Sequence, residues 1–260
     1  MKYWIYDTHA HTNLSPLFDS FDEIAKNCIN EGIMFNVVGT NIKDSSIAIE
    51  QAKKYENIAA IIGIHPSDSN NLDSNSTFYE LEKLFLENRK YILGFGETGL
   101  DYHYQNFNKD KQKEFFIKHI NLSNKYNVPL IVHVRDAHND CLEILQKHAE
   151  NPSKILIHCF SSDATIVKKY IEQGYYISVP GIITFKKSFS LHEALKLIPL
   201  NKLLIETDCP WLSPEPNRGK INSPLNIKYI IQDVSNKLNI PLLQISKTIF
   251  ENSLLFFNRK

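Results

Sequence analysis

Eight short runs rich in β-branched and aromatic residues recur along the chain, separated by more polar stretches. Each run is apolar almost without interruption, and does not alternate between apolar and polar positions. Continuous apolar character is typical of strands buried on both faces of a parallel sheet, whereas alternation is typical of strands with one solvated face. We therefore predict strands at residues 3–9, 33–39, 58–65, 91–97, 128–134, 154–160, 175–181 and 202–208.

Several of the intervening stretches carry helical signals. Residues 161–174 begin with a Ser/Asp start and stop at Gly174, and residues 21–32 stop at Gly32. Further helices are predicted within 110–126, 188–198, 223–238 and 241–257. Strands and helices alternate eight times without a linker or a change of composition. This alternation predicts an α/β protein with one domain over residues 1–260, folded as a (β/α)8 or TIM barrel.

Composition and charge narrow the functional class. Lys+Arg and Asp+Glu both number 29, which argues against a protein that coats nucleic acid by bulk charge. A nuclease stays compatible, because a metal centre supplies positive charge locally. The four cysteines are widely spaced, which favours a reduced, cytoplasmic protein. No signal peptide and no apolar run long enough for a bilayer is recognised, so no membrane association is expected. No obligate protein partner is evident from the sequence.

Side chains suited to metal binding lie at the C-terminal ends of the predicted strands. In a barrel these ends converge on one mouth, where such enzymes carry their active sites. The residues are His9, His11, His65, Glu97, His133, His158 and Asp208. Together, the six other than His65 would give three or four N and O ligands to each of two divalent ions, a set that suits Zn²⁺, Mn²⁺ or Mg²⁺.

Neighbouring residues receive supporting roles. His9 and His11 point to the same side by strand alternation, so both can bind one ion. Glu206 lies on the same side as Asp208, and we interpret it as a residue that supports the ligands from behind. Cys159 and Cys209 adjoin proposed ligands, and alternation predicts that they point away and pack behind the site. No metal role is expected for the other histidines, which are His103, His119, His138, His148 and His192.

The stretch "GFGETG" after the fourth predicted strand matches the G-x-G-x-x-G pattern of dinucleotide-binding folds. That pattern requires a helix directly after the glycines. Here the polar and aromatic stretch "LDYHYQNFNKDKQ" follows instead, so an NAD-dependent oxidoreductase is disfavoured. We expect Gly96 and Gly99 to let the backbone turn sharply, and the resulting loop to present Glu97. Asp101 and Tyr102 are expected to order that loop from behind.

The ordered motifs "DTHAH", "GIHP", "GETGLDY", "HVRDA", "HCFS" and "ETDCPWLSP" resemble those of the TatD family of metal-dependent deoxyribonucleases and related hydrolases. The resemblance extends from Asp7 to the final "ENSLLFF" and implies a barrel of the metallo-dependent hydrolase type. It implies one ion bound by His9, His11, Glu97 and Asp208, and a second bound by Glu97, His133 and His158. Glu97 is then the bridge between them, and Asp208 also accepts a proton from the attacking water. His65 and Arg135 match positions that face the substrate phosphate.

This chain departs from the family pattern at a few positions. Ser162 follows "HCFS" where Gly is usual, and Ser67 follows "GIHP" where His is common. Ile221 and Ser223 stand in "RGKINSP" where Arg and Glu are usual. The predicted metal positions are intact, so these departures affect the substrate side of the site.

The expected activity is hydrolysis of phosphodiester bonds in DNA or another phosphate-bearing substrate. One version of this hypothesis is a 3′–5′ exonuclease. Small basic clusters at Lys186–Lys187 and at Arg218 with Lys220 agree with an anionic substrate. The main alternative is an esterase or amidohydrolase on the same scaffold, with an aminoacyl-tRNA ester as one example. Many such sites bridge two metals with a modified Lys, whereas this chain offers Glu97. A barrel that serves only for binding is the third alternative, disfavoured by the intact ligand set.

Overall fold

The computed structural model describes residues 4–104, 106 and 108–259. Eight parallel strands pair in sequence order, each with the next along the chain, which confirms the predicted (β/α)8 barrel. Almost every strand residue is buried, as the uninterrupted apolar runs require. The strands are β1 (Ile5–Ala10), β2 (Ile33–Val38), β3 (Ile58–Ile62), β4 (Ile92–Asp101), β5 (Leu130–Arg135), β6 (Ile155–Ile157), β7 (Tyr176–Val179) and β8 (Leu203–Ile205).

The barrel closes between β1 and the segment that follows β8. The Asp208 N–H donates to the His9 carbonyl at 2.9 Å, and the His11 N–H donates to the Cys209 carbonyl at 2.8 Å. A parallel bridge joins Ala10 to Cys209 in the same place. Closure therefore uses backbone groups of the residues that carry candidate ligands, which fixes the first and last strand ends against each other.

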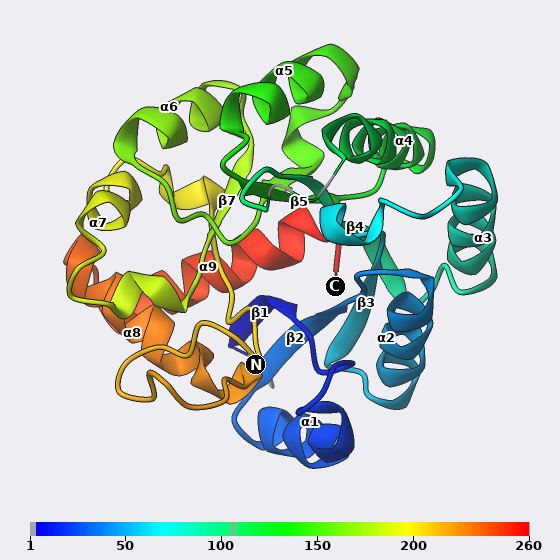
Figure 1. Cartoon of the computed structure of the whole chain (residues 1–260). Coiled ribbons are helices and arrows are strands. Elements are labelled where there is room, and N and C mark those ends of the chain that lie inside the picture. Colours follow the sequence, from blue (N-terminus) through cyan, green and yellow to red (C-terminus); the bar gives the residue numbers. More distant parts are fainter. Residues whose placement is uncertain (1–3, 105, 107, 260) are drawn as a thin grey trace.

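Helices surround the strands as an outer ring (Figure 1). Asn41, Asp73, Asn108 and Asp163 each cap the start of a helix by accepting backbone N–H groups, as expected for these residue types. The ring consists of α1 (Phe21–Asn30), α2 (Ile42–Lys54), α3 (Ser74–Glu87), α4 (Lys109–Tyr126), α5 (His138–His148), α6 (Ala164–Glu172), α7 (Phe189–Leu195) and α8 (Ile227–Leu238).

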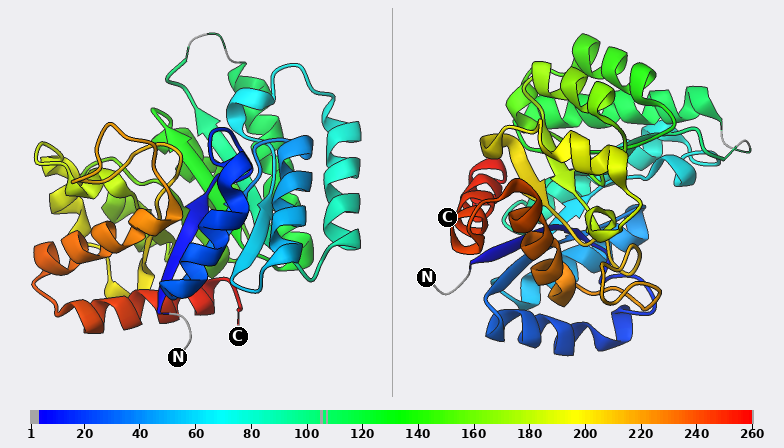
Figure 2. Two further views of the ribbon diagram at one scale, coloured as in Figure 1. Left: turned by 90° about the horizontal axis from the view of Figure 1, so that it is seen from below. Right: turned by 90° about the vertical axis from the view of Figure 1, so that its left-hand side faces the viewer.

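A further helix, α9 (Leu242–Phe256), lies across the N-terminal end of the barrel (Figure 2). Its Phe250 and Phe256 pack with Tyr6 and Leu204 of the strands in one apolar cluster. This end of the barrel is thus filled, and only the opposite end is available for a site. Among the described residues, no helix has the length and apolar character needed to cross a bilayer.

The observed elements differ from the predicted ones mainly at the strand ends. The sixth and eighth strands stop at Ile157 and Ile205, short of the predicted 160 and 208. The fourth strand instead continues to Asp101, four residues beyond the predicted end. Helices α2, α3 and α5 occupy stretches for which no separate helix was predicted.

Candidate metal centre

Glu97 lies inside strand β4, and the prediction that a loop presents it is wrong. The glycines on either side serve a close approach of β4 to β5. A Cβ atom on Gly96 would lie 2.7 Å from the Ile131 carbonyl oxygen, and one on Gly99 would overlap the His133 carbonyl oxygen. Both glycines also have positive φ values of 145° and 142°, which side-chain-bearing residues rarely adopt. Their role is to bring Glu97 close to the end of β5.

A first group of donor atoms gathers around one carboxylate oxygen of Glu97. Oε2 lies 3.4 Å from His9 Nε2 and 3.6 Å from His11 Nε2. Oδ1 of Asp208 lies 3.9 Å and 3.5 Å from the same two nitrogens, which are themselves 3.1 Å apart. The structure thus brings together the four residues predicted for one ion.

A second group gathers around the other oxygen of the same carboxylate. Glu97 Oε1 lies 2.7 Å from His133 Nδ1 and 2.8 Å from His158 Nε2. The two imidazole nitrogens are 3.4 Å apart. These are the three residues predicted for the other ion, and Glu97 has one oxygen in each group.

Donor separations in both groups lie within about 0.4 Å of those around a bound metal ion. Metal–ligand bonds of about 2.1 Å place neighbouring donors roughly 3.0–3.5 Å apart in tetrahedral or octahedral geometry. The observed separations run from 2.7 to 3.9 Å. The residues present therefore fit a divalent cation in each group.

Three histidines have polar partners on the side of the ring that faces away from the centre of the site. His11 Nδ1 donates to the Val38 carbonyl at 2.9 Å, so its Nε2 carries the lone pair in the neutral ring. His158 Nδ1 faces Glu206 Oε1 at 3.2 Å, and His133 Nε2 faces Asp101 Oδ2 at 3.3 Å. The Nε2 lone pair of His11 therefore faces carboxylate oxygens. His133 and His158 face carboxylates with both ring nitrogens; burial opposes protonation of these rings, but the carboxylates outweigh burial and raise the pKa of both. The nitrogens that face Glu97 thus need a proton or a bound cation between them and the carboxylate.

The carboxylates at the centre are stabilised in their charged form. Burial alone would raise the pKa of Glu97, but the neighbouring rings of His158, His65 and His133 outweigh burial and hold it well below the ordinary value. Burial likewise opposes the charged form of Asp208, yet contacts with His11 and His9 lower its pKa. Both groups are therefore available as anionic ligands at neutral pH.

Asp101 and Glu206 support the second group from behind. Asp101 is almost fully buried, and its other oxygen, Oδ1, accepts the His103 N–H at 2.9 Å. Glu206 is fully buried and also accepts the Cys159 N–H at 2.5 Å, which agrees with the supporting role predicted for it. Sequence reasoning missed the contact between Asp101 and His133. The available signal was the spacing of Glu97 and Asp101 within "GETGLD". Residues four positions apart lie on the same face of a continuous strand, here β4.

His65 lies beside the second group, with Nε2 3.6 Å from Glu97 Oε1. Its Nδ1 accepts the backbone N–H of Ser67 at 3.1 Å, and a backbone N–H can only donate. The proton of the neutral ring is therefore on Nε2, and burial lowers the pKa of His65 to about 3. His65 presents a neutral N–H donor to the site, which suits contact with an anionic oxygen better than a metal ligand role.

A cavity of about 400 Å³ opens beside the donor groups, and His133, His158, Asp208 and Arg135 line it. Arg135, at the end of β5, stacks its guanidinium over Tyr104 at 5.6 Å from the ring centroid. Cys159 also lines this cavity, with Sγ 3.6 Å from Asp208 Oδ2, so the prediction that it packs behind the site is wrong. The strand has already ended at Ile157, and the positive φ of 47° at Cys159 breaks the alternation.

Two further buried residues stabilise the strand ends that carry the ligands. Asp7 accepts hydrogen bonds from the Thr207 N–H at 2.8 Å and the Thr207 hydroxyl at 2.6 Å, and so links β1 to the segment after β8. His119 accepts the Ile64 N–H at 3.1 Å and contacts the Thr98 hydroxyl at 3.0 Å. Cys209 is fully buried, in keeping with its predicted packing role.

Comparisons with known proteins agree with this geometry. The model of the family described as TatD related DNase matches residues 6–258. An uncharacterized metal-dependent hydrolase of Mycoplasma genitalium is 37% identical over 258 residues, with 97% of this chain and 98% of the relative covered. Another, from Bacillus subtilis, is 33% identical, with 97% and 98% covered. A TatD homologue from Escherichia coli superimposes with a TM-score of 0.93 at 23% identity, with 99% of each chain covered. A TatD family hydrolase from Entamoeba histolytica gives a TM-score of 0.90 at 24% identity, with all of both chains covered.

Proposed function

The chain belongs to the family of TatD-related DNases, and from this premise we propose that it is a metal-dependent hydrolase that cleaves phosphodiester bonds of DNA. The observation that carries the proposal is the orientation of Glu97. Its two oxygens face two separate sets of donors, one with His9 and His11 and the other with His133 and His158. This arrangement supports two divalent ions, Zn²⁺, Mn²⁺ or Mg²⁺, bridged by one carboxylate.

Two adjacent divalent cations, when bound, lower the pKa of a water molecule and stabilise negative charge on phosphoryl oxygens. The protein supplies the remaining groups. Oδ1 of Asp208 faces His9 and His11, while Oδ2 lies near Cys159. Asp208 and Cys159 both line the cavity. Oδ2 is thus the atom placed to accept the proton of the attacking water.

Two side chains near the second donor group are placed to contact the substrate. His65 offers its Nε2–H to a non-bridging phosphate oxygen, because its other nitrogen is occupied by Ser67. Arg135 lines the cavity and offers a planar guanidinium that can bind two phosphate oxygens at once. Both groups favour a phosphodiester over a neutral ester or amide.

Four free cysteines support the proposal of a reducing, cytoplasmic location.

The test measures hydrolysis of single-stranded DNA with Mg²⁺, Mn²⁺ and Zn²⁺, by the native protein and by Asp208→Asn. We expect activity with at least one metal and a loss of about 10²–10⁴-fold in the variant, the range for removal of a positioned proton acceptor. Digestion of substrates labelled at either end distinguishes 3′ exonuclease from endonuclease action. An aminoacyl ester assayed in parallel tests the competing esterase activity. Absence of DNA hydrolysis with every metal, or equal rates for both proteins, would contradict the proposal.

A further inference from the structure

Part of the cavity wall beside the metal centre is apolar and has no place in the proposed metal chemistry. This apolar part consists of Val134, Ile182, Trp211 and Leu212, and the same cavity is also lined by Arg135 and Ser161. The volume of about 400 Å³ is within the range of small-molecule sites. A phosphate group and two cations need only the polar residues, so the apolar part suits another part of the substrate.

Trp211 is the largest side chain of the apolar part. Its side chain is 51% exposed, although it follows the ligand Asp208 by only three residues. The ring meets His11 edge to face, with centroids 5.3 Å apart and planes at 66°. The indole thus stands directly beside the first donor group, with part of its surface open to a ligand.

The backbone holds Trp211 in place. Its N–H donates to the Asp208 carbonyl at 3.2 Å, and its own carbonyl accepts from Asn222 Nδ2 at 2.7 Å. Asn222 is fully buried, and its side chain also donates to the Thr207 carbonyl at 2.9 Å. The neighbouring Gly181 approaches so closely that a Cβ there would overlap the Leu212 carbonyl oxygen. These contacts fix the backbone from which the indole projects, so less conformational entropy is lost when a ligand orders this segment.

We propose that Trp211 is the stacking surface for an unpaired nucleobase attached to the sugar next to the scissile phosphate. This inference rests on the proposed function and identifies the part of the substrate that the apolar part of the cavity recognises. Every base has a π-face, so stacking on an indole gives affinity without sequence preference. A base within a duplex has both faces covered by its neighbours, so this subsite requires an unpaired nucleotide at the cleavage position.

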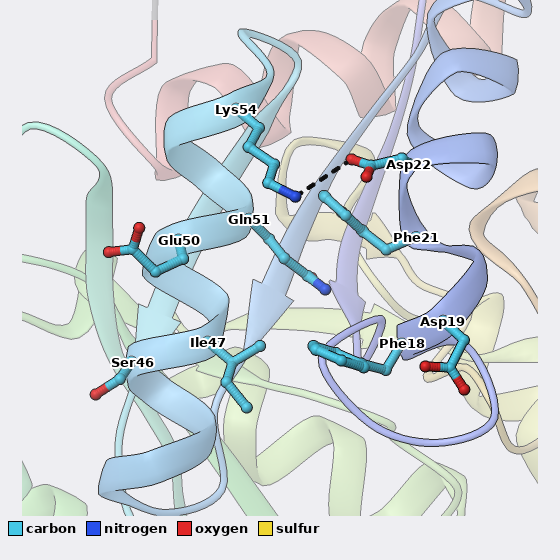
Figure 3. A pocket seen from close by; sticks show the side chains of 9 residues that line it. All are labelled: Phe18, Asp19, Phe21, Asp22, Ser46, Ile47, Glu50, Gln51 and Lys54. Carbon is cyan, nitrogen blue, oxygen red and sulfur yellow. Dashed lines mark hydrogen bonds and ion pairs between the residues drawn. The ribbon is translucent and has the colours of Figure 1, made fainter.

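A second cavity of about 500 Å³ provides a matched control (Figure 3). It lies between α1 and α2, contains the aromatic residues Phe18 and Phe21, and is lined by no residue of either donor group. Phe18 is 48% exposed, about as much as Trp211. The carboxylates of Asp19, Asp22 and Glu50 outnumber the single ammonium group of Lys54, which pairs with Asp22 at 3.5 Å, so this cavity is acidic and no nucleotide is expected to bind there.

The experiment uses Trp211 as its own reporter. The chain has two tryptophans, so Trp4→Phe leaves a single indole. The Zn²⁺-loaded variant is titrated with thymidine 5′-monophosphate and, separately, with 2-deoxyribose 5-phosphate, which lacks the base. We expect saturable quenching by the nucleotide only, and binding of the sugar phosphate about 5- to 150-fold weaker by competition, the range for stacking of one base. Equal affinities, or nucleotide binding without any change in fluorescence, would overturn the proposal.

Substitutions separate this inference from the proposed function. Trp211→Phe should retain nucleotide affinity within a few-fold, whereas Trp211→Leu should lose the preference for nucleotide over sugar phosphate with its metal content unchanged. Phe18→Leu should behave as the native protein. If the native protein lacks nuclease activity but shows base-dependent quenching, the proposed function fails and the base subsite stands. If DNA is hydrolysed with the same KM by Trp211→Leu, the subsite fails and the proposed function stands.

Discussion

Replacement of Asp101 by Asn should weaken one metal site and leave the other intact. Both carboxylate oxygens of Asp101 face donors, Oδ2 the His133 Nε2–H at 3.3 Å and Oδ1 the His103 N–H at 2.9 Å. An amide has only one acceptor oxygen, so its NH₂ group must face one of these donors in either orientation. The Gln112 side chain pairs with both backbone groups of Asp101, which prevents the residue from moving away.

The magnitude follows from the loss of the group behind a metal-binding histidine. Removal of such a partner weakens metal binding by about 10- to 100-fold, equal to roughly 1.4–2.8 kcal/mol. Competition titration of Zn²⁺ against a fluorescent chelator should give one of two sites weaker by that factor. Asp136→Asn is the matched control, because Asp136 contacts the same His103 from an exposed position. Its metal affinities should equal those of the native protein.

Glu206→Gln provides a graded comparison with Asp101→Asn. One oxygen of Glu206 accepts from His158 and Cys159, while the other faces the Thr8 hydroxyl, which can also accept a hydrogen bond. A Gln side chain can therefore satisfy every partner, and the loss of affinity should be smaller than for Asp101→Asn. The reasoning is refuted if Asp101→Asn folds normally and binds both ions as the native protein does, or if both sites weaken equally.

Three further changes test other parts of the structure. Glu97→Gln should lower the affinity for both ions, because both donor groups use this carboxylate, and metal analysis that still finds two ions per chain would contradict the bridge. Gly99→Ala should lower the free energy of unfolding by about 1–3 kcal/mol more than Gly174→Ala, because a Cβ at 99 overlaps a backbone oxygen whereas none is within 4 Å at 174; equal thermal shifts would refute this. Burial lowers the pKa of His119 to about 4 from an unfolded value near 6.5, so its contribution to stability is complete above pH 6.5 and is lost as the pH falls toward 4. In metal-free buffer, the free energy of unfolding of His119→Gln should fall between pH 6.5 and pH 4 by on the order of 3 kcal/mol less than that of the native protein. Identical pH profiles for the two proteins would exclude the effect.

The sequence predicted the barrel and the grouping of the ligands for the same physical reason. Strands buried on both faces must be apolar throughout, so a polar residue at the end of such a run stands out. His133 and His158 directly follow an uninterrupted apolar run, and His9 and Asp208 lie three residues beyond the end of one. Parallel topology then places all four at one mouth. The pattern needs no knowledge of side-chain contacts, which is why it was sufficient.

Errors arose where backbone geometry departs from the local pattern. The glycines around Glu97 are typical turn signals, yet β4 continues through them, because their positive φ values and missing side chains allow close packing against β5. Continuation of that strand is what carries Asp101 to His133. At Cys159, alternation predicted the wrong side because β6 had already ended two residues earlier. Neither effect follows from hydrophobic periodicity, since both depend on contacts between neighbouring strands.

The unusual "KINSP" loop shows how a departure from a family pattern can leave a site intact. Asn222 anchors the loop, because its Nδ2 group donates to the carbonyls of Thr207 and Trp211, and its Oδ1 accepts from the Asn226 side chain. The side chain of Ile221 is 61% exposed and does not contribute to this anchor. An Arg at 221 and a Glu at 223 would add one positive and one negative charge to the loop, while the positions of Trp211 and of the predicted ligand Asp208 would still be set by Asn222. The loop departure thus leaves the net charge of the loop unchanged, and the predicted metal ligands do not depend on it.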